Sequence, residues 1–321
     1  MSTTPASPTP SEITALPARP GRDRGPTRWI VLAVVAVVAV AGILFATLRG
    51  GVEPAAAADR VAVKVGTTEA SADYWPVLVD LAAKENIDIQ LVNFTDYTQA
   101  DPALSQGQID LNLFQHLLFL ANYNVANSDT LTPIGATVVV PLGVYSSKHT
   151  DLAQIPAGGQ VSIPNDATNQ ARALLVLQQA GLISLTGGGN PLSTPADIDT
   201  AASKVSVTPV DAAQTVASLP SVDAAVINNN FALDADLDPS KALYNDDPAS
   251  PAAEPYINAF VARADQKDNP TYLRIAQLYH DPSVTAAVVA ASKDTAVIVD
   301  RPAADLGTIL GGLETVVRDA S

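Results

Sequence analysis

Two polar residues occupy positions from which a folded chain commonly presents groups to a ligand. Arg172 falls in the first turns of a helix predicted over Thr168–Ala180, behind the loop that begins at Asn165. A helix start offers free N–H groups and partial positive charge, and an arginine adds a planar pair of donors suited to a carboxylate. Asn228 follows the apolar run Ala224–Ile227, so its amide can donate and accept at the carboxyl end of a predicted strand. The alternatives without a ligand are a surface or capping arginine and an asparagine that forms a turn.

Aromatic side chains gather near a second strand-to-helix junction. Aromatic residues make up only 5% of the chain, so a cluster of them is informative. Phe114 and His116 flank the junction, Phe119 lies three residues beyond His116 on the same helix face, and Tyr97 lies upstream. From this pattern alone, core packing is favoured over a pocket, because aromatic residues near a strand end usually belong to the core and a lone histidine is usually structural.

The elements that must position these residues alternate between strand and helix. The first predicted strands are Val61–Val65, Ile87–Phe94 and Ile109–Phe114. Apolar residues recur at helical spacing from Tyr74 to Ala82, and Asp101-Pro102 opens a helix with proline at a tolerated first-turn position. The run His116–Tyr123 also reads as helical. This β-α-β-α-β order indicates a parallel sheet with right-handed crossovers.

A second alternating series follows. Its predicted strands are Gln160–Ile163, Val205–Pro209 and Ala224–Ile227. Val138–Tyr145 is predicted as one strand, but Pro141 suits an edge or a crossover between lobes better than a central position. Tyr256–Arg263 predicts a strand that returns to the first lobe, and two helices are expected at about 270–292 and 302–318.

The predicted fold is α/β and bilobal, with two α/β lobes joined by two crossovers. Lobe I comprises residues 61–141 and 256–321, and lobe II comprises residues 142–255. Open α/β sheets bind ligands in the crevice outside the carboxyl ends of their strands, so we expect the ligand between the lobes.

Composition excludes several classes of function. The 321 residues are 47% hydrophobic, which argues against a disordered protein. Residues 1–50 carry a net charge of +3 within a chain of net charge −15, so the remainder is strongly acidic and would repel nucleic acid. The absence of cysteine excludes disulfides and thiolate sites, and three histidines make a histidine-rich metal site improbable. No cofactor is implied.

The N-terminal region is predicted to direct the chain to a membrane. Residues 29–48 are uncharged and, as a helix, would span about 30 Å, the thickness of a bilayer core. Four arginines precede this segment and one follows it, which predicts that residues 1–28 are cytoplasmic and that the body lies outside the cell. Residues 1–28 are predicted to be a disordered tail, and residues 49–60 a linker. The alternative is a cleavable signal peptide cut near Ala55–Ala58, which exports the body equally.

Six ordered segments of the body carry a resemblance to a known family. They are GTTEASADYW (66–75), VNFTDYTQADPAL (92–104), DLNLFQHLLFL (110–120), PIGATVVVPLGVYSSK (133–148), IPNDATNQARALLVLQQAGLI (163–183) and AVINNNFA (225–232). With these segments the body resembles the NlpA/MetQ family, the methionine-binding components of ABC importers. The resemblance covers residues 61–321 and implies the type II periplasmic-binding-protein fold. The family is usually anchored by a lipid on a cysteine, which this chain lacks; the apolar segment 29–48 offers a replacement anchor.

The resemblance implies a role for each candidate residue. Arg172 matches the arginine that binds the ligand carboxylate, and Asn228 matches a ligand-contacting asparagine, whereas Asn229 and Asn230 are interpreted as turn residues. Asn169 is a further candidate, with helix capping as its alternative. Tyr97, Phe114, His116 and Phe119 are implied as walls of the side-chain pocket; the family often has tyrosine at the position of Phe119. A permease and a cytoplasmic ATPase are the implied partners.

Other classes of function stay open beside this one. An exported enzyme is disfavoured because the chain has no cysteine nucleophile, GxSxG elbow, HExxH motif or GxGxxG loop. A membrane-anchored receptor or sensor would keep the fold, but residues 1–28 carry no recognisable signalling domain. A binding protein could also take another small amino acid, a methionine dipeptide or a sulfonate.

Overall fold

The computed structural model describes residues 60–320. The predicted tail at 1–28, the predicted spanning helix at 29–48 and the linker up to residue 59 lie outside the described residues. Within residues 60–320, no helix is both long enough and apolar enough to cross a bilayer.

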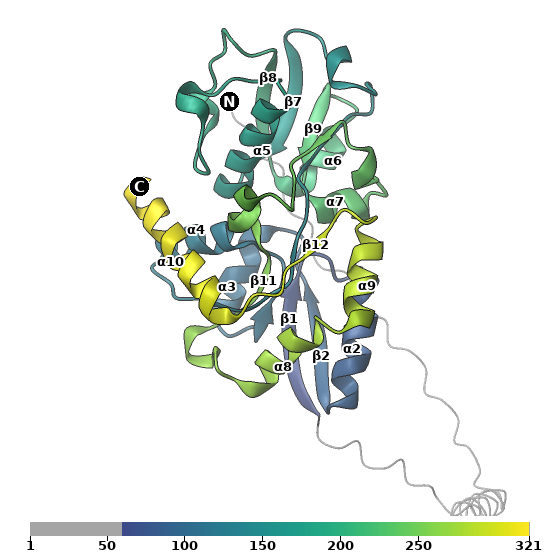
Figure 1. The fold of residues 1–321 in the computed structure, drawn as a ribbon, viewed down its shortest axis with the longest axis vertical. Helices are drawn as coiled ribbons and strands as arrows, with labels where there is room; N and C mark the ends of the chain where they lie inside the picture. Colours follow the sequence, from purple (N-terminus) through teal and green to yellow (C-terminus); the bar gives the residue numbers. More distant parts are fainter. Residues whose placement is uncertain (1–59, 321) are drawn as a thin grey trace, which may run out of the picture. The chain divides into compact units, whose positions relative to one another are not determined.

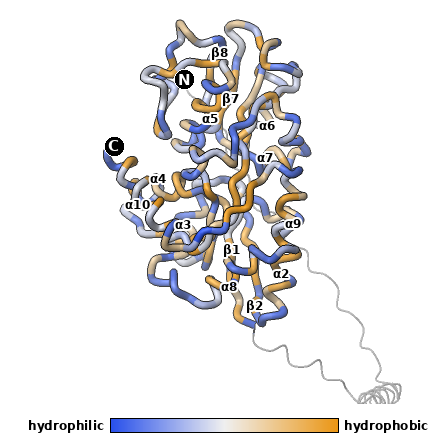
Figure 2. The backbone as a smooth tube through the Cα atoms, viewed as in Figure 1, coloured by the Kyte–Doolittle hydropathy of each residue, from blue (hydrophilic) through white to orange (hydrophobic). Residues whose placement is uncertain are grey.

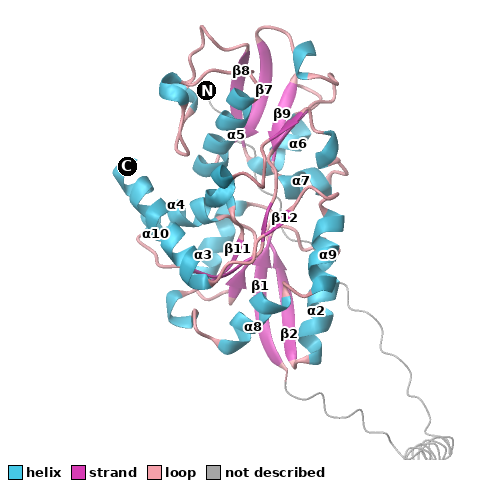
Figure 3. Ribbon diagram, viewed as in Figure 1, coloured by secondary structure: helices cyan, strands magenta, loops and turns pink. Residues whose placement is uncertain are grey.

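The described residues form two five-stranded sheets, seen in Figure 3 as separate groups of magenta strands. The first sheet has the order β2-β1-β3-β11-β4. Its strands are β1 (Val61–Thr67), β2 (Ile87–Asn93), β3 (Leu111–Asn112), β4 (Thr132–Ala136) and β11 (Ala259–Ala262). β1 pairs in parallel with β2 and β3, while β11 runs antiparallel to β3 and β4. The strand predicted over Ile109–Phe114 is shorter in the structure, where β3 comprises only Leu111–Asn112.

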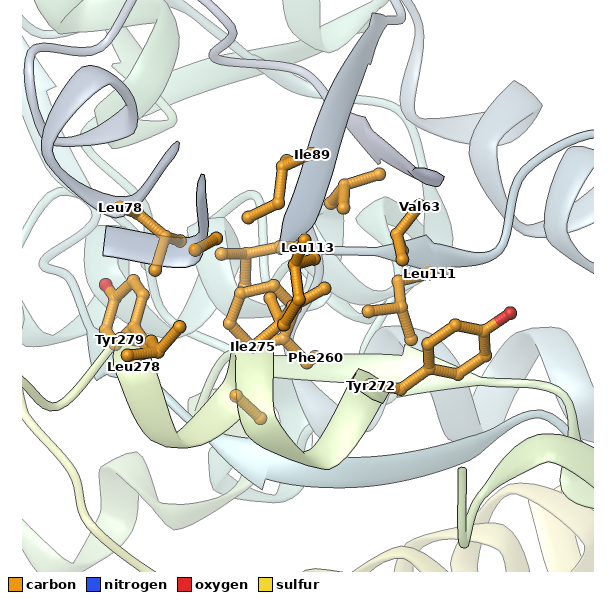
Figure 4. Packing of buried hydrophobic residues seen from close by; sticks show 14 of the residues in the cluster. Val63, Leu78, Ile89, Leu111, Leu113, Phe260, Tyr272, Ile275, Leu278 and Tyr279 are labelled. Carbon is orange, nitrogen blue, oxygen red and sulfur yellow. The ribbon is translucent and has the colours of Figure 1, made fainter. Parts of the chain in front are cut away.

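Helices cover both faces of the first sheet (Figure 1). They are α2 (Tyr74–Lys84), α3 (Ala100–Ser105), α4 (Leu117–Asn127), α8 (Pro270–Leu278), α9 (Pro282–Ala291) and α10 (Ala303–Ala320). One core lies between the strands and α2, α8 and α9; Figure 4 shows the side chains of Leu113, Phe260 and Ile275 meeting there. A second core joins the sheet to α3, α4 and α10 through residues such as Leu120 and Leu306. Burial of these apolar side chains is the main force that holds the strand ends in place.

The second sheet has the order β10-β6-β9-β7-β8. Its strands are β6 (Gly143–Tyr145), β7 (Gly159–Pro164), β8 (Val205–Val210), β9 (Ala224–Ile227) and β10 (Tyr244–Asn245). β7 pairs in parallel with β8 and β9, and β6 runs antiparallel to β9 and β10. Its helices are α5 (Ala167–Gln179), α6 (Thr215–Ser218) and α7 (Asn229–Asp234). All four residues of β9 are buried, which explains the unbroken apolar run before Asn228.

Short 3-10 helices occupy many of the connections. They are η1 (Tyr97–Gln99), η2 (Leu152–Gln154), η3 (Thr186–Gly188), η4 (Pro195–Asp197), η5 (Ala212–Gln214), η6 (Pro239–Lys241), η7 (Pro251–Tyr256) and η8 (Ala264–Gln266). In Figure 2 the orange, hydrophobic parts of the tube follow the strands in the middle of the described chain. The blue, hydrophilic parts lie mainly on outer helices and turns.

The chain passes from the first sheet to the second through residues 137–142 and returns through residues 246–258. The single strand predicted over Val138–Tyr145 is wrong: β5 (Val138–Val139) pairs with β12 (Val297–Ile298), and β6 begins only at Gly143. Pro141 lies in the gap between them, where its missing N–H interrupts no ladder.

The C-terminal region also departs from the prediction. The single helix expected at about 270–292 is two helices, α8 and α9, separated at Tyr279–Asp281. Asp281 caps α9 by accepting a hydrogen bond from the N–H of Ser283 at 2.9 Å, and Pro282 occupies the first turn. The break is therefore a helix start signal within an otherwise continuous apolar pattern.

Candidate ligand-binding site

A cavity of about 50 Å³ lies among segments from both sheets. Its lining residues are Tyr97, Phe114, Gln115, His116, Phe119, Val140, Asn169, Arg172, Asn228, Asn229, Asn230 and Asn258. All seven site residues predicted from the sequence are among them, so the structure brings the predicted set together. The volume exceeds the ~10–15 Å³ needed for one water molecule but gives room for only a few.

Arg172 lies in the second turn of α5 and is only 4% exposed. Its Nε donates to Oδ2 of Asp246 at 2.7 Å and its Nη2 to Oδ1 of Asp246 at 3.2 Å. Nη2 also donates to the carbonyl of Val140 at 2.9 Å, and the guanidinium carbon lies 4.2 Å from the centre of the Tyr256 ring. Contacts with three residues therefore hold the guanidinium at the cavity wall.

This arrangement corrects one expectation from the sequence. The Nε–Nη2 edge of Arg172 pairs with Asp246, and Nη2 also donates to Val140, so neither two-donor edge is free to bind a ligand carboxylate through two hydrogen bonds. Within residues 60–320, no group accepts a hydrogen bond from Nη1 of Arg172. The guanidinium thus retains Nη1 as its donor for an anion in the cavity.

His116 is a neutral donor in the cavity wall. It caps α4, and its Nδ1 accepts a hydrogen bond from the N–H of Phe119 at 3.1 Å, which assigns the proton to Nε2. Burial, reinforced by the neighbouring charge of Arg172, lowers the pKa of His116 to about 3. Nε2 lies 3.4 Å from Oδ1 of Asn169, so the imidazole donates across the gap between the two sheets' segments.

A row of amides continues from His116. Asn169 donates from Nδ2 to both oxygens of Asp166, at 3.0 and 3.2 Å, and Asp166 also caps α5. These bonds orient Oδ1 of Asn169 toward His116 and toward Nδ2 of Asn228, which donates to it at 2.9 Å. Oδ1 of Asn228 is buried and has no partner in the described part of the chain. A buried acceptor without a donor is costly, so it marks where a donor from a ligand fits.

Aromatic rings enclose one end of the cavity. Tyr97, Phe114 and Phe119 lie with ring centres 5.6 to 6.2 Å apart. Phe231 joins them, 5.1 Å from Tyr97, although it does not line the cavity. The hydroxyl of Tyr97 donates to Oδ1 of Asn230, which links the aromatic cluster to α7. Rings at these separations attract one another and form an apolar wall.

Sequence reasoning missed several of the residues around this cavity. Asp246 and Tyr256 both fix Arg172: Asp246 lies in irregular chain after β10, and Tyr256 ends η7, although it was predicted as the start of a strand. Asn258 lines the cavity between η7 and β11, where it was interpreted as part of a strand. Asn229 and Asn230 were predicted to be turn residues, but they begin α7 and also line the cavity. The signal that was available is the repeated asparagine directly after a buried strand.

Comparison with known proteins identifies a family for most of the chain. Residues 63–299 match the model of a family described as NlpA lipoprotein. A relative from Haemophilus influenzae, described as a probable D-methionine-binding lipoprotein MetQ, is 35% identical over 239 residues, covering 73% of this chain and 86% of the relative. The D-methionine-binding lipoprotein MetQ of Escherichia coli is 34% identical over 230 residues, covering 70% and 83%.

Solved structures show the same mixed α/β architecture. A nutrient-binding protein from Burkholderia cenocepacia bound to methionine superposes with a TM-score of 0.68 at 34% identity, covering 74% of this chain and 99% of that one. The methionine-binding protein MetQ superposes with a TM-score of 0.70 at 32% identity, covering 75% and 98%. The two curated relatives are named for methionine binding, and a solved structure from Streptococcus pneumoniae is named as the substrate-binding protein of a methionine transporter. By the match of the family model over residues 63–299, and by relatives that are about a third identical over the aligned residues, this chain belongs to the NlpA lipoprotein family.

Proposed function

We propose that this chain is the extracytoplasmic substrate-binding protein of an ABC importer and that its ligand is methionine. In this proposal the protein has a type II periplasmic-binding-protein fold, in which residues 61–141 and 256–321 form one lobe and residues 142–255 the other. The ligand is held between the lobes and delivered to a permease that a cytoplasmic ATPase drives. The names of the relatives, which include methionine-binding proteins and the substrate-binding protein of a methionine transporter, support this role.

The observation that carries the proposal is the complementarity between the cavity and a zwitterion with an apolar tail. Nη1 of Arg172 is a charged donor without a partner among the described residues, and it suits a carboxylate. Oδ1 of Asn228 is a buried acceptor without a donor there, and it suits an ammonium. The rings of Tyr97, Phe114 and Phe119 form an apolar wall suited to a polarizable thioether.

Opening and closing of the lobes follow from the place of the cavity. Its lining residues come from both lobes, so the lobes must part before a ligand can enter. Polar contacts that link the lobes support a closed state: Tyr97 donates to Asn230, His116 to Asn169, and Ser71 to Asp234 at 3.1 Å. A ligand that binds the closed form more tightly than the open form shifts the equilibrium toward closure.

Attachment to the membrane is proposed through the N-terminal segment. The relatives are named lipoproteins, but the 321 residues contain no cysteine that could carry a lipid. The uncharged segment 29–48 is long enough to span a bilayer as a helix and would hold the body on the extracytoplasmic side. Mass spectrometry of the mature N-terminus tests this step, because cleavage near Ala55–Ala58 would remove the anchor.

Isothermal titration of the body with methionine and a panel of other amino acids and sulfonates tests the proposal. We expect stoichiometric binding that favours methionine, without turnover of the ligand. Arg172→Ala and Asn228→Ala should each weaken methionine binding by at least about tenfold, because each removes one hydrogen bond to a charged group. Arg274→Ala is the matched control, since Arg274 forms a comparable carboxylate pair with Glu85 on the exposed surface.

Two results would overturn the proposal. If Asn228→Ala and Arg172→Ala both bind methionine as the wild type does while remaining folded, the cavity is not the ligand site. If methionine binds but cells lacking the gene import it normally, and the intact gene alters another methionine response, the protein is a receptor rather than a transport component.

A further inference from the structure

Gln115 is a polar residue of the ligand cavity that the proposed function leaves unused. It lies between β3 and α4, directly before His116, and is only 3% exposed. It lines the cavity together with Arg172 and Asn228. Its Oε1 is buried and accepts no hydrogen bond from the described part of the chain. A buried acceptor without a donor is costly, so this oxygen marks a place where a donor from a ligand fits.

The nitrogen of the same amide is fully used. Nε2 of Gln115 donates to Oδ1 of Asp101 and, at 3.1 Å, to Oδ1 of Asn112. A side-chain amide carries two N–H donors, so both of them are engaged. Because resonance keeps an amide planar, fixing its nitrogen also fixes Oε1 on the other side of the group. The side chain cannot turn toward another donor without breaking both bonds.

Two buried residues hold Gln115 in this orientation. Asn112, in β3, donates from Nδ2 to Oδ1 of Asp101 at 2.9 Å, so the three side chains form a closed ring of hydrogen bonds. Asp101 lies in the first turn of α3 and is 1% exposed. When its carboxylate is ionised, it polarises the amide of Gln115 and increases the negative charge on Oε1, because hydrogen bonds in a chain reinforce one another. The ring therefore presents an acceptor suited to a cation.

A second acceptor of the same kind belongs to the other lobe of the proposed fold. Gln115 falls within residues 61–141 and Asn228 within residues 142–255, and the side-chain oxygen of each is buried without a donor among the described residues. Arg172, the charged donor suited to a carboxylate, belongs to the same lobe as Asn228. An ammonium carries three N–H donors and can therefore donate to both oxygens. The ammonium is thus the group of an amino acid that can join the two lobes.

We propose that Oε1 of Gln115 accepts a hydrogen bond from the ammonium of the ligand, opposite Asn228, and that Asp101 and Asn112 are the positioning residues that orient it. The ammonium then links the two lobes in the closed state, so a ligand without an amino group loses this link and binds more weakly. The inference rests on the proposed function, because it takes an amino acid to be the ligand of the cavity.

Isothermal titration with two probes tests the inference: L-methionine and 4-(methylsulfanyl)butanoic acid, which is methionine without its amino group. Burial raises the pKa of Asp101 to about 7, so titration at pH 8 keeps most of its carboxylate ionised. Gln115→Met preserves the length of the side chain and removes the acceptor. We expect it to weaken methionine binding by about tenfold, the loss typical of a hydrogen bond to a charged group, and to leave binding of the acid unchanged. Gln108→Met is the matched control, because Gln108 is exposed and does not line the cavity.

Two variants of Asp101 separate positioning from folding. Asp101→Leu removes the acceptor that holds Gln115 and should weaken methionine binding by about fivefold, the loss expected for one neutral hydrogen bond, without an effect on the acid. Asp101→Asn keeps an oxygen that accepts from both amides, so it should bind methionine nearly as the wild type does. If the acid binds the wild type too weakly for titration, the contrast between these two variants in methionine binding decides the test.

Three outcomes would refute the inference. The first is that Gln115→Met binds methionine as tightly as the wild type does. The second is that Gln115→Met weakens both probes equally, which indicates a role in packing rather than in binding the ammonium. The third is that Asp101→Leu and Asp101→Asn bind methionine with the same affinity. A wild-type protein that binds no methionine would instead refute the proposed function, so the two failures are distinguishable.

Discussion

Arg172 and Asp246 form a two-point ion pair at the wall of the ligand cavity, with Nε to Oδ2 at 2.7 Å and Nη2 to Oδ1 at 3.2 Å. Their side chains are only 5% and 15% exposed. Oδ1 of Asp246 also accepts from the N–H of Leu142 at 2.8 Å, so the same carboxylate fixes α5, the segment after β10 and the crossover between the sheets. The residue proposed to bind the ligand is therefore also part of what holds the second sheet together.

Removal of the charge on Asp246 should destabilise the fold. Asp246→Asn leaves the buried guanidinium of Arg172 without its counter-charge, and loss of one partner of a buried pair typically costs about 3–5 kcal/mol. Glu85→Gln is the matched control, because it breaks the pair with Arg274 on the exposed surface, where solvent screens the charges, and it should leave the unfolding free energy nearly unchanged. Urea unfolding measures both free energies, and equal losses in the two variants would contradict the account.

The hydroxyl of Tyr97 should contribute to closure of the lobes. It donates to Asn230 across the gap, so Tyr97→Phe removes a bond that exists only while the lobes are closed. A neutral hydrogen bond contributes about 1 kcal/mol, so the dissociation constant for methionine should rise about fivefold. Tyr123→Phe is the control, because the Tyr123 hydroxyl bonds within its own lobe, to Asp129 at 3.4 Å. Unchanged affinity after Tyr97→Phe would rule out this role.

Much of the site could be predicted from the sequence because its residues stand beside regular elements. Arg172 follows a visible helix start, and Asn228 follows four buried apolar residues of β9. His116 and Phe119 share a helix turn, which the spacing alone indicates. In each case the position of the side chain follows from a local pattern and from the rule that strand ends meet at one edge of a sheet.

The residues that were missed depend on the path of the chain between elements. Asp246 follows the two-residue strand β10, and no local pattern shows that it would meet a helix that ends more than sixty residues earlier. The break at Pro282 was misjudged for a different reason. The apolar spacing continues through it, but Asp281-Pro282 is also a strong start signal, and here the cap decides the structure.

His116 should make the protein less stable in acid. Its pKa falls to about 3 in the folded state, against a usual value of 6.5. Below pH 6.5 the unfolded chain therefore binds a proton at His116 that the folded chain does not bind. Stability then falls by as much as about 1.4 kcal/mol per pH unit. His116→Asn keeps a capping side chain for α4 but does not titrate. Between pH 6.5 and 5 the unfolding free energy of His116→Asn should fall by about 2 kcal/mol less than that of the wild type. If the unfolding free energies of the two proteins fall equally over this range, the effect is excluded.

Asp101 should have the opposite pH dependence. It is 1% exposed and accepts from Asn112 at 2.9 Å and from Gln115, yet burial outweighs these bonds and raises its pKa from 3.8 to about 7. Between pH 3.8 and 7 the unfolded chain releases a proton that the folded one retains, so stability falls as the pH rises.

Asp101→Asn removes this titration and leaves an acceptor for both amides. Relative to the wild type, its unfolding free energy should therefore increase from pH 4 to pH 7, by about 2 kcal/mol or more. Asp268→Asn, at a side chain that is 84% exposed, is the matched control and should show no such trend. Urea unfolding at a series of pH values makes the comparison. A difference between Asp101→Asn and wild type that is constant with pH would mean that Asp101 is ionised in the folded protein at neutral pH.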